Sequence, residues 1–216
     1  MSDRDEAPAR PRARRRTIRQ APDVRRQDLL DVTVSCLARL GPRGATGREI
    51  CRQAGVSHGL LRHYFSNPDN LLLETYQELC DRMIQRFEEE LAIPRDDAWE
   101  TIDRFFAVLF SEQWSNSEML GAWIAFWTLV RSNEEFAQVS EDYNRRVRDM
   151  LIAAAARLPR GPLPLEDLAA LLSAVMDGLW LDFCLSPERL SRERAMALGR
   201  LALRRLAPPP QAMTAE

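Results

Sequence analysis

Prolines, glycines and helix-capping residues divide this chain into segments of helical length. Within the segments, apolar residues recur at helical spacing, as Leu30, Val34 and Leu37 do in the first of them. No run of alternating β-branched residues lies between the breaks. The pattern therefore predicts an all-α fold. We expect about nine helices, at 23–40, 47–54, 58–65, 70–92, 96–112, 116–131, 134–157, 165–185 and 188–206.

Several of these boundaries depend on residues that cap helix N-termini. The expected caps are Asp96 or Asp97, Ser115 and Asn133, since short polar side chains accept hydrogen bonds from the first free amides of a helix. Ser186 followed by Pro187 predicts the start of the last helix, because proline is tolerated at the first helical position.

Two short helices near the N-terminus carry the most specific signal. Thr46 and Glu49 have the spacing of a capping box, in which each side chain bonds the other residue's amide. Gly55 is placed to end that helix in the left-handed conformation, and Ser57 caps the next one. Two short helices packed on a longer first helix form a three-helix helix-turn-helix module, so the chain is expected to bind DNA.

The segment from Ser57 to Tyr64 is the expected recognition helix. Leu61 and Phe65 are four residues apart and should face the core, which turns His58, Arg62 and His63 outward. Arginine to guanine is the most frequent specific contact in the major groove, so Arg62 is the best candidate for base readout.

Other residues of the module are suited to contact phosphates. Gly59 leaves the helix start unobstructed, the Ser57 hydroxyl and the first amides can donate to an anion, and Arg48 can hold a flanking phosphate. A solvated helix face is the alternative for each residue taken singly. The candidate DNA-binding residues are Thr46, Arg48, Ser57, His58, Gly59, Arg62, His63 and Tyr64.

Charge is distributed unevenly along the chain. Residues 1–70 hold 14 Arg and 8 acidic residues, whereas residues 71–216 hold 16 Arg and 24 acidic residues. A basic front part suits a polyanion partner. Residues 1–22 are expected to form a disordered arm, and its six arginines between Arg10 and Arg19 either remain solvated or add DNA contacts.

Cysteines and histidines show no spacing suited to a metal site. Cys36, Cys51, Cys80 and Cys184 are scattered in apolar contexts, which indicates free thiols in a reducing, cytoplasmic compartment. The only histidines, His58 and His63, are five residues apart, so they miss a common helix face. We expect neither a metal nor a cofactor, and no membrane span, since no apolar run of about 18 residues is evident.

The second half is rich in tryptophan and contains one acid in an apolar stretch. Trp123 and Trp127 lie on one stripe of the 116–131 helix, and Asp177 lies three residues before Trp180. Core packing explains most of these aromatics. A buried carboxylate needs compensation, which either an arginine of another helix or a cationic ligand between aromatic faces could supply. The candidate ligand-binding residues are Trp114, Trp123, Trp127, Asp177 and Trp180.

The last two helices are expected to join two copies of the chain. Ala170 and Ala174 permit close helix approach, and Leu198, Leu201 and Leu203 add apolar surface. A four-helix interface across a two-fold axis would supply the second recognition helix that a palindromic operator requires.

Residues 24–75 resemble the N-terminal signature of the TetR family of transcriptional regulators. The match rests on Ala45-Thr46, Glu49-Ile50, Ala54-Gly55-Val56-Ser57, Gly59-Leu60-Leu61, His63-Tyr64-Phe65 and Asn70-Leu71-Leu72. The resemblance implies a homodimeric repressor that a small molecule releases from a palindromic operator. It also implies DNA contacts at Ser57, Gly59, Arg62, His63 and Tyr64. One departure is Pro68, where family members usually carry a phosphate-binding lysine.

Two later segments are similar to the BetI-like, choline-responsive subgroup of that family. They are Ala122-Trp123-Ile124-Ala125-Phe126-Trp127 and Asp177-Gly178-Leu179-Trp180-Leu181. The implied effector is choline or a related quaternary ammonium compound, and a different small apolar ligand is the alternative.

An all-helical enzyme is the alternative from another class. Asp96, Asp97 and Glu100 could be taken for a metal-binding cluster, but they fit a helix N-terminus better. No nucleophile–base pair accompanies them, so we do not expect an enzyme. The expected division is a disordered arm at 1–22, a helix-turn-helix domain at 23–68, a helical ligand-binding and dimerisation domain at 69–207 and a disordered tail at 208–216.

Overall fold

A computed structural model describes residues 22–159 and 161–207 of the chain, and all of its regular elements there are helices. The all-α prediction is confirmed. The expected arginine-rich arm and the C-terminal tail lie outside the described residues. The helices are α1 (Pro22–Gly44), α2 (Gly47–Ala54), α3 (His58–Phe65), α4 (Pro68–Ala92), α5 (Ala98–Leu109), α6 (Ser117–Val130), α7 (Glu134–Ala155), α8 (Leu165–Leu185) and α9 (Arg192–Leu206).

Caps set the bounds of the helix-turn-helix as expected. The Thr46 hydroxyl accepts from the Glu49 amide at 3.3 Å, and the Ser57 hydroxyl accepts from the Leu60 amide at 3.2 Å. Gly55 ends α2 with φ of 64°, a conformation that favours glycine. The predicted reciprocal bond of the capping box, from the Thr46 amide to the Glu49 carboxylate, is wrong, because that carboxylate accepts hydrogen bonds from Arg52 instead.

Four other helices differ from expectation in a boundary. Asn116 caps α6 in place of Ser115, whose hydroxyl donates to the Ser111 carbonyl. The last helix begins at Arg192 after the cap Ser191, since residues 187–190 form a turn. The α5 helix is shorter than expected. The α1 helix continues to Gly44, but Gly41 (φ 65°, ψ 179°) interrupts its helical path where the sequence predicted an end.

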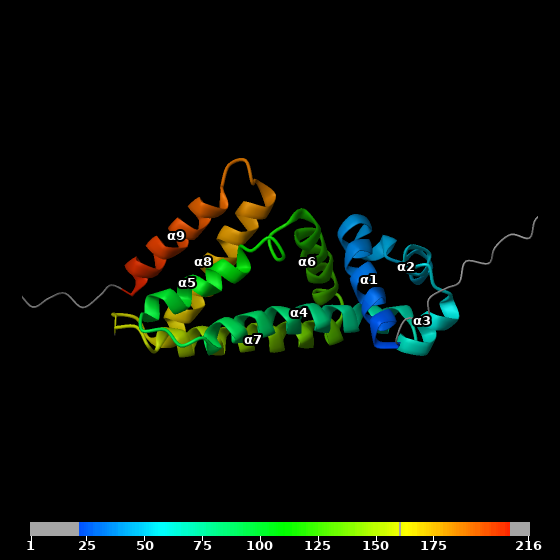
Figure 1. Ribbon diagram of the computed structural model, residues 1–216, viewed down its shortest axis with the longest axis horizontal. Coiled ribbons are helices and arrows are strands. Elements are labelled where there is room, and N and C mark those ends of the chain that lie inside the picture. The colour runs from blue at the N-terminus through cyan, green and yellow to red at the C-terminus, as the bar shows by residue number, and fades with distance from the viewer. Residues whose placement is uncertain (1–21, 160, 208–216) are drawn as a thin grey trace, which may run out of the picture.

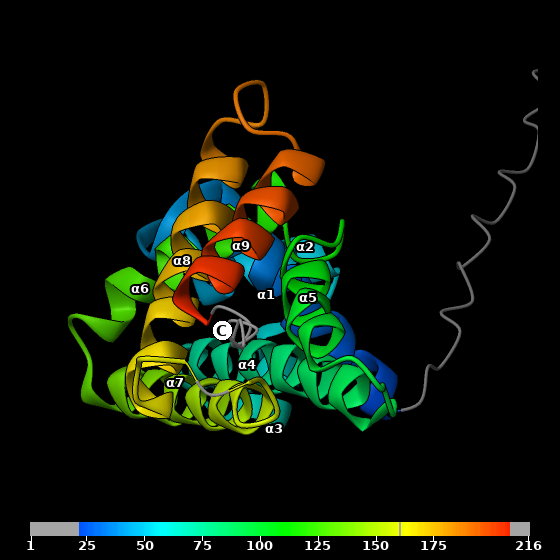
Figure 2. The same cartoon turned by 90° about the vertical axis from the view of Figure 1, so that its left-hand side faces the viewer.

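The helices form an elongated molecule with the helix-turn-helix at one end (Figure 1). The α1–α3 module is at the right of that view, and α5, α7, α8 and α9 occupy the other end. The long α4 runs between the two parts and packs on both α1 and α7. Figure 2, seen along the molecule, shows α8 and α9 side by side above α4 and α7.

The two parts are also joined through α6. Among the described elements, α1 and α6 share the most extensive packing, more than α1 shares with its own module. One cluster of buried apolar side chains runs through the whole molecule, from Leu29 and Leu37 in α1 to Leu203 in α9. A division of the chain near residue 68 therefore stays a prediction.

By length and composition, α8 could cross a membrane. It has 21 residues, and its most apolar window has a mean hydropathy of 1.7 with 28% of its residues buried. The expectation that no apolar stretch reaches this length was wrong. The helix packs against α7 and α9, and core helices of soluble proteins meet the same criterion.

Candidate DNA-binding surface and ligand pocket

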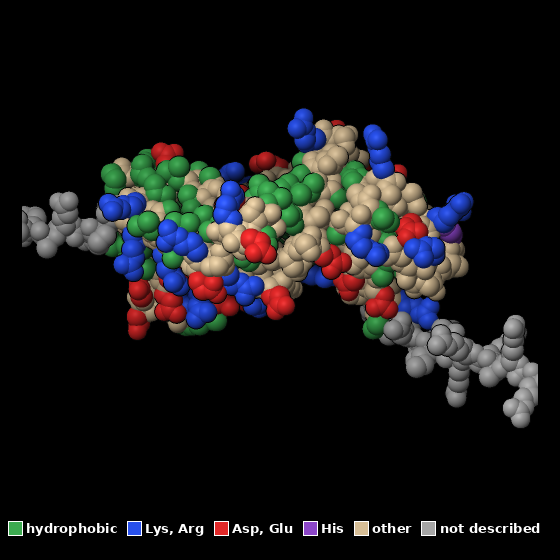
Figure 3. Space-filling view, turned by 90° about the horizontal axis from the view of Figure 1, so that it is seen from above, with side chains coloured by type: hydrophobic (Ala, Val, Ile, Leu, Met, Phe, Trp, Pro, Cys, Tyr) green, Lys and Arg blue, Asp and Glu red, His purple; other side chains and the backbone are tan. Residues whose placement is uncertain are grey.

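The α3 helix has one buried and one exposed face. Leu61 and Phe65 are buried in the core, whereas His58, Arg62 and His63 are exposed, as the spacing predicts. Tyr64 is half-buried and its ring meets the His63 ring edge-on at 5.2 Å. Figure 3 shows blue arginine and purple histidine side chains at this end of the molecule. The exposed face therefore offers cationic and neutral donors at the tip of the fold.

Neighbouring helices fix the position of α3. The Arg26 guanidinium of α1 bonds the Glu74 carboxylate of α4 and lies over the Phe65 ring, 5.2 Å from its centroid. At the other end of the module, Gly47 lies against Pro68, since a β-carbon at residue 47 would be 2.7 Å from the proline Cγ. These contacts bind α1, α2 and α4 around α3.

The candidate phosphate contacts lie beside α3. Arg48 is exposed on α2 and Gly59 is exposed at the start of α3. A β-carbon at Gly59 would have only the Ser57 hydroxyl within 4 Å, which leaves the helix start open to a close partner. Thr46 and Ser57 are exposed, although their hydroxyls serve as caps.

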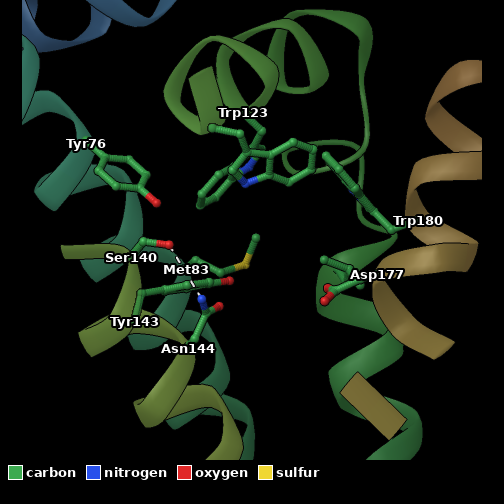
Figure 4. A pocket seen from close by; sticks show the side chains of 10 residues that line it. Tyr76, Met83, Trp123, Ser140, Tyr143, Asn144, Asp177 and Trp180 are labelled. Atoms are coloured by element: carbon green, nitrogen blue, oxygen red, sulfur yellow. Dashed lines mark hydrogen bonds between the residues drawn. The ribbon is translucent and has the colours of Figure 1, made fainter. Parts of the chain in front are cut away.

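A cavity of about 350 Å³ lies among α4, α6, α7 and α8, with Leu109 at the end of α5 also in its lining (Figure 4). Its size falls in the range typical of small-molecule sites. Four of the five candidate ligand residues line it, namely Trp123, Trp127, Asp177 and Trp180. The other lining residues are Tyr76, Met83, Leu109, Ser140, Tyr143 and Asn144.

Aromatic rings form a continuous wall in this pocket. The Trp123 and Trp127 rings are 6.5 Å apart between centroids, and Trp127 meets Trp180 at 6.4 Å with an interplanar angle of 78°. Trp123 also meets Tyr76 of α4 edge-on and packs near Tyr143 of α7. Trp127 is 41% exposed, so the wall reaches the mouth of the pocket.

Asp177 is the one carboxylic acid of the lining, and no basic residue lines the pocket. Within the described part of the chain, no arginine forms an ion pair with the Asp177 carboxylate. Of the two kinds of compensation considered from the sequence, an arginine of another helix is therefore not observed. Asp177 is exposed to solvent, yet the surrounding protein partly desolvates its carboxyl and raises its pKa. The pocket therefore presents an uncompensated carboxylate beside aromatic faces.

Trp114 does not line the pocket, contrary to expectation. It is buried in the connection between α5 and α6, behind Trp180. Its carbonyl oxygen accepts a hydrogen bond from the Trp180 indole Nε1 at 2.9 Å. Its own Nε1 has no partner among the described residues. Trp114 thus orients a pocket residue through its backbone.

The polar residues of the opposite wall were missed from the sequence. Ser140 and Asn144 lie one turn apart on α7, and the Asn144 amide donates to the Ser140 hydroxyl at 3.5 Å. Tyr143 lies between them, and Tyr76 comes from α4. The spacing of residues 140 and 144 marks a shared helix face, but only the tertiary packing shows that this face meets Asp177 across a cavity.

The titratable residues form no metal site in the described ranges. There, no three His, Cys, Asp or Glu side chains are grouped closely enough to hold an ion. Cys36, Cys51, Cys80 and Cys184 are free, as predicted, and burial raises the pKa of each thiol, to about 12 for Cys80. High thiol pKa values make these residues poor metal ligands and nucleophiles.

Two family models match the chain. Residues 29–75 match the model described as bacterial regulatory proteins of the tetR family. Residues 98–208 match that of the BetI-type transcriptional repressor C-terminal domain. The first match covers the helix-turn-helix, and the second covers the region that supplies α6, α7 and α8 to the pocket.

Individual relatives agree with these matches. The HTH-type transcriptional regulator BetI of Escherichia coli strain K12 is 30% identical over 179 residues, which cover 82% of this chain and 91% of the relative. A transcriptional regulator of Pseudomonas aeruginosa PAO1 has a similar structure, with a TM-score of 0.80, 30% identity and coverage of 88% of this chain and 93% of that one.

A more distant structure shares the fold. A transcriptional regulator of Saccharomonospora viridis, crystallised in complex with choline, has a TM-score of 0.69 at 20% identity, with 85% of this chain and 95% of that one covered. The family models and the curated relative agree over most of the chain. The chain therefore belongs to the TetR family of bacterial transcriptional regulators, is a DNA-binding transcriptional repressor and carries a BetI-type C-terminal domain.

Proposed function

We propose that this repressor acts as a homodimer in the cytoplasm and is released from a palindromic operator by a quaternary ammonium compound such as choline. The observation that carries the proposal is the pocket, in which the Asp177 carboxylate lies beside tryptophan rings with no basic residue in the lining. The α3 helix would read the operator, and the effector would bind about the middle of the molecule.

Electrostatics favour a cation in this pocket. An uncompensated carboxylate in a partly desolvated site is costly, and a bound cation would offset that cost. The faces of Trp123, Trp127 and Trp180 can each attract a quaternary ammonium, by roughly 0.5–2 kcal/mol depending on how well water is excluded. A purely apolar ligand would leave the carboxylate uncompensated.

The S. viridis structure supports the same assignment at the level of the fold, since that regulator accommodates choline. A cavity of about 350 Å³ is near the lower end of the range for ligand pockets, which suits a small effector.

On the DNA side, the exposed face of α3 supports direct readout. Arg62 and His63 are exposed there, and Arg48 stands nearby on α2. We assign Arg62 to a base edge and Arg48 to a phosphate. Thr46, Ser57, His58, Gly59 and Tyr64 would complete the contact surface.

Dimerisation would cover the apolar surface of α8. Leu171, Ala174, Gly178 and Leu185 are exposed and share one face of that helix by their spacing. Leu201 of α9 is exposed as well. Figure 3 shows green hydrophobic patches on the side where α8 and α9 lie. A two-fold contact here would explain why so apolar a helix is largely uncovered in one chain.

One experiment tests the proposal as a whole. Mobility shift of the full chain on the DNA upstream of its own gene should show a complex that choline dissociates, and calorimetry should show choline binding. Binding to DNA with no response to choline and no heat of binding would refute the cationic effector. Failure to shift that DNA at low salt would count against the assigned operator.

A further inference from the structure

The turn between α3 and α4 is short, and its backbone is strained. Ser66 ends α3 with φ of 63° and ψ of −51°, a conformation that a residue with a side chain rarely adopts. Asn67 then caps α4, whose first residue is Pro68. Because such a turn is costly, contacts on both of its sides must hold it. The same contacts set the angle between α3 and α4.

One side chain of α1 contacts both sides of this turn. The Arg26 guanidinium lies over the ring of Phe65, the residue before Ser66, with its carbon 5.2 Å from the ring centroid. The same guanidinium donates to the Glu74 carboxylate in the second turn of α4. Among the described helices, α3 packs mainly on α2 and α4. Arg26 therefore supplies a link from α1 that helix packing alone does not provide.

We infer that Arg26 is a positioning residue for DNA recognition, which holds the recognition helix at its angle on α4 without binding DNA itself. The inference rests on the proposed function, since it takes α3 to be the recognition helix. It adds that a residue outside the assigned contact surface decides whether Arg62 and His63 reach the operator.

The charge of Arg26 is already compensated within the protein. Glu74 pairs with the guanidinium, and the face of the buried Phe65 ring attracts the same cation. An arginine paired with a glutamate presents no net charge to a phosphate. By contrast, Arg48 and Arg62 form no ion pair within the described ranges, so their charge is available to DNA.

A change in the angle of α3 affects specific binding most. A base edge accepts a hydrogen bond only from a side chain placed at the right distance and direction, whereas attraction to phosphates acts over a longer range. Loss of the Arg26 contacts should therefore weaken the operator complex and leave the affinity for random DNA nearly unchanged.

Arg82 offers a matched control. Its guanidinium also joins α1 to α4, because it donates to Asp31 of α1 and to Glu78 of α4. Its side chain is 34% exposed, close to the 40% of Arg26. It is eight residues beyond Glu74 on α4, or about 12 Å further along the helix. No aromatic ring of α3 lies under it in the described structure.

Titration of DNA with the full chain over a salt series tests the inference, with the DNA upstream of its own gene as operator and random DNA beside it. Arg26→Met keeps an unbranched apolar side chain and removes the charge. It should weaken operator binding about tenfold, from about threefold for each of two recognition helices on a palindromic site. The salt dependence of operator affinity should stay that of the parent. Arg82→Met should bind the operator within about twofold of the parent.

Variants of the pair locate the effect. Glu74→Gln should weaken operator binding, and the double variant Arg26→Met/Glu74→Gln should lose no more than Arg26→Met alone, because the two residues share one contact. Arg26→Lys should keep most of the operator affinity, since an ammonium group can still pair with Glu74 and lie over Phe65. Urea unfolding of each variant shows that it is folded and gives its stability.

The outcomes separate this inference from the proposed function. A salt dependence lowered by about two phosphate contacts per dimer in Arg26→Met would mean that Arg26 binds DNA, which overturns the inference. An equal loss in Arg82→Met would overturn it too, because any link between α1 and α4 would then serve. Parent-like binding by Arg26→Met, with Arg62→Ala weakened, would show that α3 keeps its angle without Arg26. Parent-like binding by both variants would overturn the assignment of α3 itself, and the inference with it.

Discussion

Gly121 of α6 lies directly against the backbone of Ala38 of α1. A β-carbon at residue 121 would be 2.7 Å from the Ala38 carbonyl oxygen and 3.1 Å from its α-carbon. One turn earlier on α6, Glu118 accepts a hydrogen bond from the Ser35 hydroxyl of α1. The helix that carries Trp123 into the pocket is therefore in backbone contact with the first helix of the DNA-binding module.

Replacing Gly121 by alanine should destabilise the protein. Because the obstacle is backbone, α6 must move away from α1, and overpacking of this kind costs about 1–3 kcal/mol. The gain in helix propensity from glycine to alanine, about 1 kcal/mol, offsets part of that cost. Urea unfolding at one protein concentration measures the difference.

Gly59→Ala is the control for that measurement. A β-carbon at residue 59 meets only the Ser57 hydroxyl at 3.7 Å, an ordinary contact, so this variant should keep or slightly raise the free energy of unfolding. If Gly121→Ala were as stable as Gly59→Ala, the contact with Ala38 would not constrain α6.

Local signals in the sequence predicted the helices, whereas contacts between distant helices had to come from the structure. Gly41, Gly55 and Ser57 act through their own backbone or the next turn, so their positions were predictable. Ser115 was chosen as a cap where Asn116 serves, because both neighbours are competent and only the path of the chain decides between them. The break at Gly41 follows from its φ of 65°.

Only the part of the pocket that depends on local spacing within one helix was predictable from the sequence. Asp177 and Trp180 are three residues apart on one helix, so their common face was evident. Tyr76 and Ser140 come from α4 and α7, and no local pattern brings these two helices together. Trp114 was placed in the lining by its residue type, but the turn between α5 and α6 buries it behind Trp180.

Substitutions in the helix-turn-helix should divide base readout from phosphate binding. Arg62→Ala should cost about 1–3 kcal/mol on the preferred operator and relax sequence preference. Arg48→Ala should weaken binding to all DNA sequences alike, and it should reduce the salt dependence of DNA affinity by about one phosphate contact. Both side chains are exposed, so the fold should not change. Binding assays on operator and random DNA over a salt series make the comparison.

The control for these variants is Arg145→Ala. Arg145 is an exposed arginine of α7, a helix that shares no extensive packing with α3, and it pairs with Asp142. It should leave DNA affinity unchanged. Unaltered operator binding by an Arg62→Ala/His63→Ala double variant would refute the assignment of α3 as the recognition helix.

Choline affinity should depend on pH through Asp177. Desolvation raises the pKa of this carboxyl above its ordinary value of 3.8 in the free protein, whereas a bound cation favours the carboxylate. Affinity should therefore fall as the pH is lowered through the raised pKa of the unliganded protein. Asp177→Asn should bind choline at least about tenfold more weakly, since an interaction with a charged group is lost, and should show no such pH dependence.

Ionisation of the Asp177 carboxyl should lower the free energy of unfolding, although it raises choline affinity. Because its pKa is higher in the folded than in the unfolded chain, ionisation disfavours folding, and the penalty develops as the pH rises from about 3.8 to the folded pKa. Asp177→Asn should thus be more stable than the parent at neutral pH. The difference should vanish at pH values below 3.8. Urea unfolding from pH 3 to pH 7 measures it, and a less stable Asn variant at neutral pH would contradict a desolvated, unpartnered carboxylate.

Charge on the exposed face of α8 should separate the two copies of the chain. Leu171 is 42% exposed and shares that face with Ala174, Gly178 and Leu185. Leu171→Arg would bury an unpaired cation in a two-fold contact, where each copy meets the other's arginine. Light scattering should then report a monomer, and operator affinity should fall steeply because a palindromic site engages two recognition helices at once.

Ile93→Arg is the matched control for this variant. Ile93 is 51% exposed, but it belongs to the connection between α4 and α5 and is part of neither α8 nor α9. It should remain dimeric and bind the operator normally. A dimer of unchanged stability in Leu171→Arg would place the interface on another surface. Loss of the dimer with unchanged operator binding would instead show that one copy suffices to hold the site.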